Sequence, residues 1–110
     1  MLHPDLLSKL PALREFLAKH RVKSACIFGS ATGDNYREDS DIDLLIAFEE
    51  PLDSSEYAQN FWSLYLNLPR LLGRQVDIVM EEDLKNPYFI EEVNDTKISI
   101  YESKGEEILV

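Results

Sequence analysis

Two aspartates at the start of one apolar segment constrain the fold of this chain more than any other feature. Asp41 and Asp43 flank Ile42, and the residues from there to Phe48 are almost all apolar. Such a run between polar stretches is typical of a central β-strand. Successive side chains of a strand face opposite sides, so the two carboxylates share one face, about 6.5 Å apart, while Ile42 and Leu44 point into the core.

A third acid stands inside another apolar run, Val76 to Met80. If that run forms a neighbouring strand, about 4.8 Å away, Asp77 completes a cluster of three acids on one sheet face. Unit charges about 5 Å apart repel by roughly 3 kcal/mol at an effective dielectric of about 20, so the cluster favours cations. Mg²⁺ prefers a few carboxylates combined with substrate phosphates. Two such ions would serve an in-line displacement at phosphorus.

A glycine and a serine follow the apolar run from Val22 to Phe28, which is expected to be a short strand. Gly29 lets the backbone approach a phosphate, and Ser30 offers a hydroxyl. The backbone N–H groups of a helical turn beyond it would point towards an anion. The polar segment 31–40 then returns the chain to the acids, so a phosphate site and a metal site are expected side by side.

The remaining pattern alternates helices and strands. Apolar residues at three- and four-residue steps predict a helix from Pro4 to His20, and Asn86-Pro87 is expected to open a short helix. His3 and His20 are taken as surface residues without a role. Apolar and polar residues alternate from Lys97 to Glu102, which is expected to be the last strand. Residues 108–110 would pair with it as a hairpin.

The second main helix is expected from Tyr57 to Leu68, with Ser54-Ser55 as its N-cap and Glu56 in its first turn. Pro69 is expected to bend or end it, and Gly73 to stop a short turn after it. This helix is apolar on more than one face. Packing against the first helix and contact with a partner protein both explain that pattern.

Length and composition limit the class of protein. At 110 residues the chain can bury one core, so residues 1–110 are assigned to a single domain. The net charge of −10 argues against direct nucleic acid binding, which needs a positive surface. The single cysteine, Cys26, and the lack of signal-peptide or membrane-span patterns lead us to expect a cytoplasmic protein.

The spacing of these motifs resembles a known family. Gly29-Ser30, ten residues, then Asp41-Ile42-Asp43 is similar to the pattern of the minimal nucleotidyltransferases, or MNT domains, of the DNA polymerase beta superfamily. The stretch from Leu71 to Asp77 resembles the approach to that family's third acid. The resemblance covers about residues 20–102. Many relatives carry an arginine soon after the Gly-Ser pair, whereas this chain reads Ala31-Thr32-Gly33 there and has only Arg37 in that loop.

The resemblance implies an α/β (α+β) fold of the polymerase-beta type, a small mixed sheet flanked by helices. Asp41, Asp43 and Asp77 would hold two Mg²⁺ ions, Asp77 would also be a candidate base, and Gly29 and Ser30 would bind ATP. MNT domains of this size are commonly antitoxins of HEPN-domain RNase toxins. The implied reaction is transfer of AMP from ATP to a tyrosine hydroxyl of that toxin.

Two other functions remain open from the sequence. The chain could neutralise a partner by covering it, without catalysis, or it could be a transferase for a small molecule. Relatives that modify antibiotics carry additional domains for the acceptor, and 110 residues leave little room for such a pocket. A neighbouring reading frame for a small helical protein with the HEPN signature, Arg-x-x-x-x-His, would favour the two antitoxin functions.

Overall fold

The computed structural model describes residues 2–33, 36–37 and 39–103. The hairpin expected at 108–110 lies outside the described residues. Within them, the other expected strands and helices are all present. In chain order the elements are α1 (Pro4–Lys19), β1 (Val22–Phe28), the 3-10 turn η1 (Gly29–Thr32), β2 (Ile42–Phe48), α2 (Ser54–Leu72), β3 (Val76–Met80), the 3-10 turn η2 (Glu81–Asp83), α3 (Pro87–Thr96) and β4 (Ile98–Glu102).

The strands form one mixed sheet in the order β3-β2-β1-β4. β1 pairs antiparallel with both β2 and β4. β2 and β3 are parallel, and α2 is the crossover that joins them. The expected small mixed sheet flanked by helices is therefore confirmed, with β2 in an interior position.

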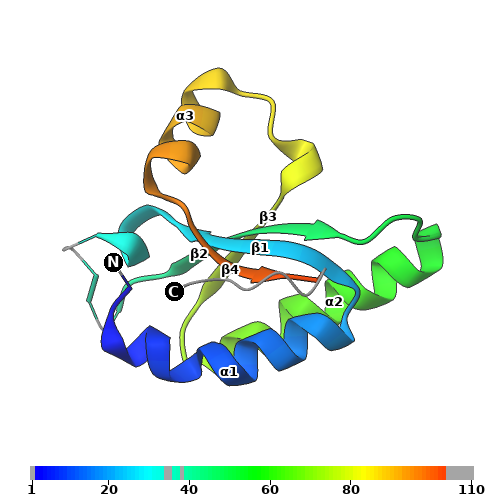
Figure 1. Cartoon of the computed structure of the whole chain (residues 1–110), viewed down its shortest axis with the longest axis horizontal. Coiled ribbons are helices and arrows are strands. Elements are labelled where there is room, and N and C mark those ends of the chain that lie inside the picture. The colour runs from blue at the N-terminus through cyan, green and yellow to red at the C-terminus, as the bar shows by residue number, and fades with distance from the viewer. Residues whose placement is uncertain (1, 34–35, 38, 104–110) are drawn as a thin grey trace.

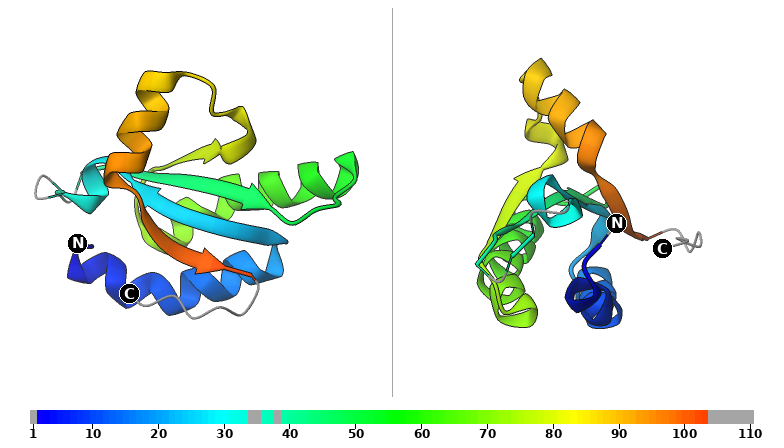
Figure 2. Two further views of the ribbon diagram at one scale, coloured as in Figure 1. Left: turned by 45° about the horizontal axis from the view of Figure 1, so that its top comes forward. Right: turned by 90° about the vertical axis from the view of Figure 1, so that its left-hand side faces the viewer.

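The helices cover the two faces of the sheet unequally. Figure 1 shows α1 and α2 side by side under one face and α3 above the other, and the turned views of Figure 2 agree. The larger core fills the space under α1 and α2, where alternate residues of β2 meet Leu13, Leu64 and Leu68. A smaller cluster of Phe28, Leu45 and Val93 lies on the α3 face. This second cluster leaves room for polar residues of β2 and β3 on the same face.

Helix α1 follows its predicted pattern, because four leucines at three- and four-residue steps are buried. One expectation for its end was wrong. His20 is half-buried, and its ring nitrogens bond the Phe16 carbonyl and the Ser63 hydroxyl, each at 2.7 Å. It thus links α1 to α2, a contact between residues far apart in sequence. None of the helices in the described residues is long and apolar enough to cross a membrane.

Helix α2 differs from its prediction at both ends. Its N-cap is Asp53, whose Oδ1 accepts the Glu56 N–H at 2.8 Å, and not the serine pair. It also runs through Pro69 to Leu72, where it was expected to bend or end. The helix continues because Leu68 and Leu72 are both buried in the core, which outweighs the hydrogen bond that a proline removes. Gly73, in the left-handed conformation, ends it.

Candidate active site

Two of the three predicted acids are direct neighbours in the sheet. Parallel pairing of β2 and β3 places Asp43 opposite Asp77. Their neighbours in β2 and β3 alternate between faces, with Ile42 and Val76 buried in the larger core under the helices. The two carboxylates therefore lie on the face that α3 covers, at the end where both strands begin.

The Asp43 carboxyl is in an unfavourable place for a negative charge. Its pKa is raised from 3.8 to about 6, first by burial and then by the negative charges of Asp77 and Asp41. A hydrogen bond from the Asp43 side chain to Asp77 and the charge of Glu92 in α3 act in the same direction. A protonated carboxyl that bonds a second carboxylate is the state expected where two acids crowd together without a cation.

Asp41 lies just before β2 and is exposed, so it forms the solvent side of the site. No three acidic, histidine or cysteine side chains of the described residues stand close enough together to hold a metal ion as they lie. The chemistry of Asp41, Asp43 and Asp77 fits a hard divalent cation, because all three offer carboxylate oxygens and Asp43 stands opposite Asp77 in the sheet.

Gly29 stands directly against the acid pair. Phe28 is the register partner of Asp43, so the next residue turns over that carboxyl. A Cβ at Gly29 would lie only 2.6 Å from Asp43 Oδ2, and its φ of +75° is one that other residues rarely adopt. The sequence suggested that this glycine admits a phosphate. The structure adds that it admits the Asp43 carboxyl.

The turn after Gly29 and helix α3 complete the site. Ser30 is exposed at the start of η1, and no described residue hydrogen-bonds its hydroxyl, which is thus free for a ligand. The Gly29 N–H donates to Thr96 Oγ1 at 2.9 Å. Thr96 and Glu92 were missed from the sequence, where only their four-residue spacing on one helix face could have drawn attention to them.

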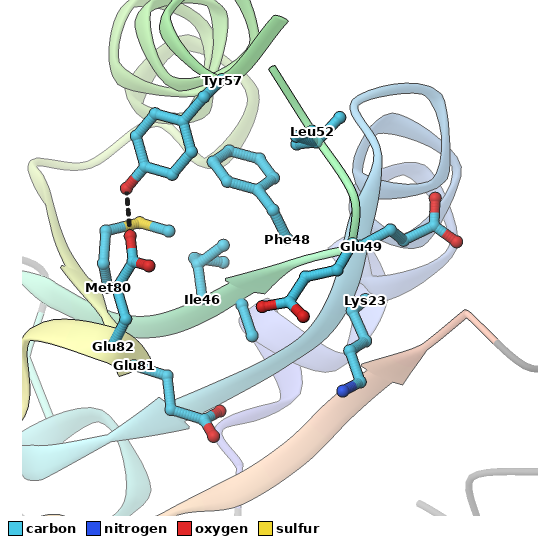
Figure 3. Close-up of a pocket in the computed structure, with 11 residues that line it drawn as sticks. Lys23, Ile46, Phe48, Glu49, Leu52, Tyr57, Met80, Glu81 and Glu82 are labelled. Atoms are coloured by element: carbon cyan, nitrogen blue, oxygen red, sulfur yellow. Dashed lines mark hydrogen bonds between the residues drawn. The ribbon is translucent and has the colours of Figure 1, made fainter. Parts of the chain in front are cut away.

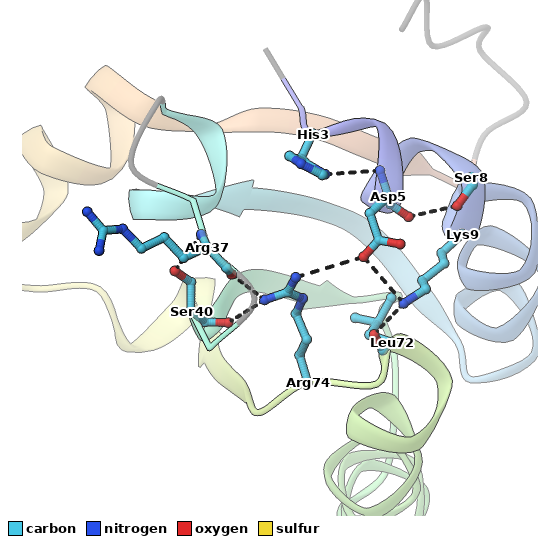
Figure 4. A network of polar contacts seen from close by, with 8 residues as sticks. All are labelled: His3, Asp5, Ser8, Lys9, Arg37, Ser40, Leu72 and Arg74. Atoms are coloured by element: carbon cyan, nitrogen blue, oxygen red, sulfur yellow. Dashed lines mark hydrogen bonds and ion pairs between the residues drawn. The ribbon is translucent and has the colours of Figure 1, made fainter.

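An arginine fixes the loop that leads into β2. The Arg74 side chain is only 9% exposed and donates to the backbone carbonyls of Arg37 and Ser40 (Figure 4). Its guanidinium also lies 4.3 Å from the Tyr36 ring centroid and 3.9 Å from Asp5 of α1. The arginine just after α2 therefore positions the segment before the first aspartate, while the side chain of Arg37 is exposed.

A cavity of about 310 Å³ lies at the end of β2 and β3 that is opposite to the acid pair, where Phe48 and Met80 end those strands. Glutamates dominate its polar lining, and the Tyr57 hydroxyl donates to Glu82 at 2.8 Å (Figure 3). Burial and this bond raise the pKa of Tyr57 to about 12. None of the three predicted acids lines the cavity, which is separate from the candidate site.

The chain resembles known proteins over most of its length. Residues 12–106 match the family model described as polymerase beta, nucleotidyltransferase. A Methanocaldococcus jannaschii protein named "Putative protein adenylyltransferase" is 38% identical over 82 residues, 74% of this chain and 80% of the relative. The Thermococcus cleftensis protein adenylyltransferase MntA is 34% identical over 73 residues, 66% of this chain and 70% of the relative.

Solved structures agree with this likeness. One described as a "putative minimal nucleotidyltransferase" is 37% identical, with a TM-score of 0.66, over 89% of this chain and 95% of that chain. A toxin-antitoxin structure with AMP-PNP shares the fold at 18% identity and a TM-score of 0.65, over 86% of this chain and 74% of that one. A Shewanella oneidensis complex of a tri-AMPylated HEPN toxin with an MNT antitoxin shares the fold at 17% identity and a TM-score of 0.60, over 87% of this chain and 71% of that one. The chain therefore belongs to the polymerase beta nucleotidyltransferase family and is a nucleotidyltransferase.

Proposed function

We propose that the chain transfers AMP from ATP to a hydroxyl group of a partner protein, a tyrosine of a HEPN toxin, and thereby acts as an antitoxin. The observation that carries this proposal is the Asp43–Asp77 pair directly beside the Gly29 turn. It combines an acidic metal site with a backbone that other atoms can approach closely. The single cysteine, Cys26, suits a reducing cytoplasm, where ATP is also available.

Each residue has a defined task in this proposal. The η1 turn, with the exposed hydroxyl of Ser30, holds the triphosphate. Asp41, Asp43 and Asp77 would hold Mg²⁺, which supplies charge stabilisation to the phosphoryl oxygens when it is bound. Asp77 takes the proton of the acceptor hydroxyl. The acceptor oxygen forms a bond to the α-phosphorus, the bond from that phosphorus to the bridging oxygen breaks, and pyrophosphate leaves.

The relatives support the choice of nucleotide and acceptor. Two of them are named for adenylyl transfer to protein. Among structures with the same fold, one toxin-antitoxin complex contains AMP-PNP and another contains a HEPN toxin that carries three AMP groups. On that basis we propose ATP as the nucleotide donor, a protein as the acceptor and a HEPN toxin as the partner of this chain.

Neutralisation by occlusion is the second candidate function, because one surface of α2 favours it. Trp62, Tyr65 and Leu66 are each more than half exposed. Apolar side chains grouped on one surface are typical of a protein interface. A chain that only bound its partner there could silence it without chemistry.

The double variant Asp41→Asn and Asp43→Asn separates the two functions. It removes two carboxylates but keeps side-chain size and strand packing, so the fold is expected to persist. A HEPN-domain toxin is the test partner, and its RNase activity is measured after incubation with ATP and Mg²⁺. We expect the wild type to neutralise it and the variant to lose transfer by about two orders of magnitude or more.

The control is the wild type without ATP, and circular dichroism confirms that the variant is folded. If the variant and the ATP-free wild type neutralise the RNase at equal stoichiometry, the acids are dispensable and occlusion is the mechanism. If neutralisation needs both ATP and the acids, catalysis is the mechanism.

A further inference from the structure

An open groove lies at the outer edge of the sheet, next to the acid pair. It encloses about 660 Å³ between the last turns of α2 and the start of β3. Asp77 lines it, and Tyr65, Pro69 and Arg70 of α2 line it as well. β3 is an edge strand, because within the described residues it pairs only with β2. The groove therefore opens directly onto the third acid of the candidate site.

The order of Gly29, Asp43 and Asp77 across this end of the sheet indicates from which side the acceptor reaches the site. Gly29 follows β1, Asp43 begins β2, and Asp77 begins β3, which is the sequence of the strands across the sheet. The triphosphate site proposed above lies on the β1 side. An in-line displacement needs the attacking oxygen opposite the leaving group. The acceptor is thus expected from the β3 side, where the groove lies.

The lining of the groove suits a polypeptide segment. Tyr65 is 54% exposed and offers an aromatic surface. Pro69 has no N–H, so the Tyr65 carbonyl lacks its usual intrahelical donor and can accept a hydrogen bond from a ligand. Arg70 is exposed and forms no ion pair with any described residue, so its charge is available to an acidic side chain.

Tyr65 lines the groove and also belongs to the exposed apolar surface of α2. The Trp62 and Tyr65 rings are edge to face, with centroids 5.5 Å apart. Leu66, at 58% exposure, follows Tyr65 on the helix. A partner that covers these three side chains is therefore placed beside the groove and, through it, beside Asp77.

We propose that this groove receives the acceptor segment of the partner protein, and that Tyr65 and Arg70 determine its specificity. The inference rests on the proposed protein acceptor. The segment lies along the edge of β3 with its hydroxyl at Asp77, an apolar side chain on Tyr65 and an acidic side chain on Arg70. The apolar surface formed by Trp62, Tyr65 and Leu66 binds the body of the same partner.

Two groove variants, each with a matched control, test the proposal. Tyr65→Ala is compared with Tyr88→Ala, a tyrosine that is 84% exposed on α3. Arg70→Glu is compared with Lys85→Glu, an exposed cation in the loop before α3. The assay measures transfer of labelled AMP to the HEPN-domain partner at varied partner and varied ATP concentrations. The thermal shift with Mg²⁺ and AMP-PNP reports nucleotide binding separately.

We expect each groove variant to raise the KM for the partner protein by about tenfold, the effect of losing one strong interface contact. The KM for ATP and the AMP-PNP shift should match the wild type, as should both control variants in every measurement. A raised KM for ATP with an unchanged KM for the partner would show that the groove holds the nucleotide base and would overturn the proposal. Groove variants identical to the wild type would also overturn it. If the wild type itself transfers no AMP to protein, the proposed function has failed, and this inference with it.

Discussion

Asp43 is the residue at which β1, β2, β3 and α3 meet. It pairs with Phe28 on one side and with Asp77 on the other, and Glu92 of α3 adds negative charge. A residue so placed is costly for the metal-free protein, because burial and neighbouring charges both oppose its ionised form. The same arrangement is favourable once a divalent cation binds. The Asp43 carboxylate is thus expected to lower the stability of the metal-free protein while it raises the affinity for a divalent cation.

The raised pKa of Asp43 predicts an unusual pH dependence for the metal-free protein. The pKa is about 6 in the folded chain against 3.8 ordinarily, so the folded state binds the proton more tightly. The stabilisation is present at low pH and is lost as the pH rises through about 6. From about pH 5 to about pH 7 this costs about 1 kcal/mol after allowance for solvent screening.

Urea unfolding in EDTA at both pH values, for the wild type and Asp43→Asn, isolates this effect from the other carboxyl groups. The wild type should lose about 1 kcal/mol relative to the variant as the pH rises. Equal changes in the two proteins would mean that Asp43 titrates normally and does not crowd Asp77.

Gly29 gives a second prediction at the scale of one residue. Gly29→Ala places a methyl group 2.6 Å from Asp43 Oδ2 at a φ of +75°. We expect a loss of stability of about 1–2 kcal/mol from the backbone conformation alone, and displacement of the carboxyl should abolish most AMP transfer. Ser30→Ala is the comparison, because it removes one hydroxyl without a clash. It should weaken triphosphate binding by about 1 kcal/mol and leave stability unchanged. Wild-type activity and stability in Gly29→Ala would contradict the close approach.

For the secondary-structure elements, the spacing of apolar residues predicted the strands well and the helix ends poorly. The strand from Ile42 to Phe48 was recognisable because local sequence and burial agree. Pro69 was misleading, because its local effect is outweighed by the burial of Leu68 and Leu72, which depends on the sheet. His20 was missed for the same reason, since Ser63 lies far from it in sequence.

The end of α2 gives a prediction for an element. Gly73 has a φ of +66° and its N–H bonds the Pro69 carbonyl at 2.8 Å, which ends the helix. Gly73→Ala should destabilise the protein by about 1 kcal/mol, because alanine is disfavoured in the left-handed region. Gly33→Ala is the control, since Gly33 has a φ of −115° and an added Cβ would have space. Thermal unfolding of both variants checks this, and equal melting temperatures would contradict the role of Gly73.

At the scale of the whole molecule, the candidate site was predictable as far as it lies on two motifs. Asp41 and Asp43 flank one residue, so alternation along a strand predicted their shared face, and Gly29 follows the preceding strand. The place of Asp77 was conditional on its strand being a neighbour of β2, and the parallel pairing of β2 with β3 meets that condition. The contribution of α3 and the groove at the β3 edge could not be predicted, because both depend on how separate elements pack.

Transfer of AMP to a partner protein through the acidic site is the function proposed for this chain. Intact mass spectrometry of the HEPN-domain partner measures that directly, after incubation with this chain, ATP and Mg²⁺. We predict a gain of one or more AMP masses with the wild type, and none when ATP or Mg²⁺ is omitted or when Asp41→Asn, Asp43→Asn replaces it. An unchanged partner mass with folded wild-type protein, ATP and Mg²⁺ all present would contradict the account.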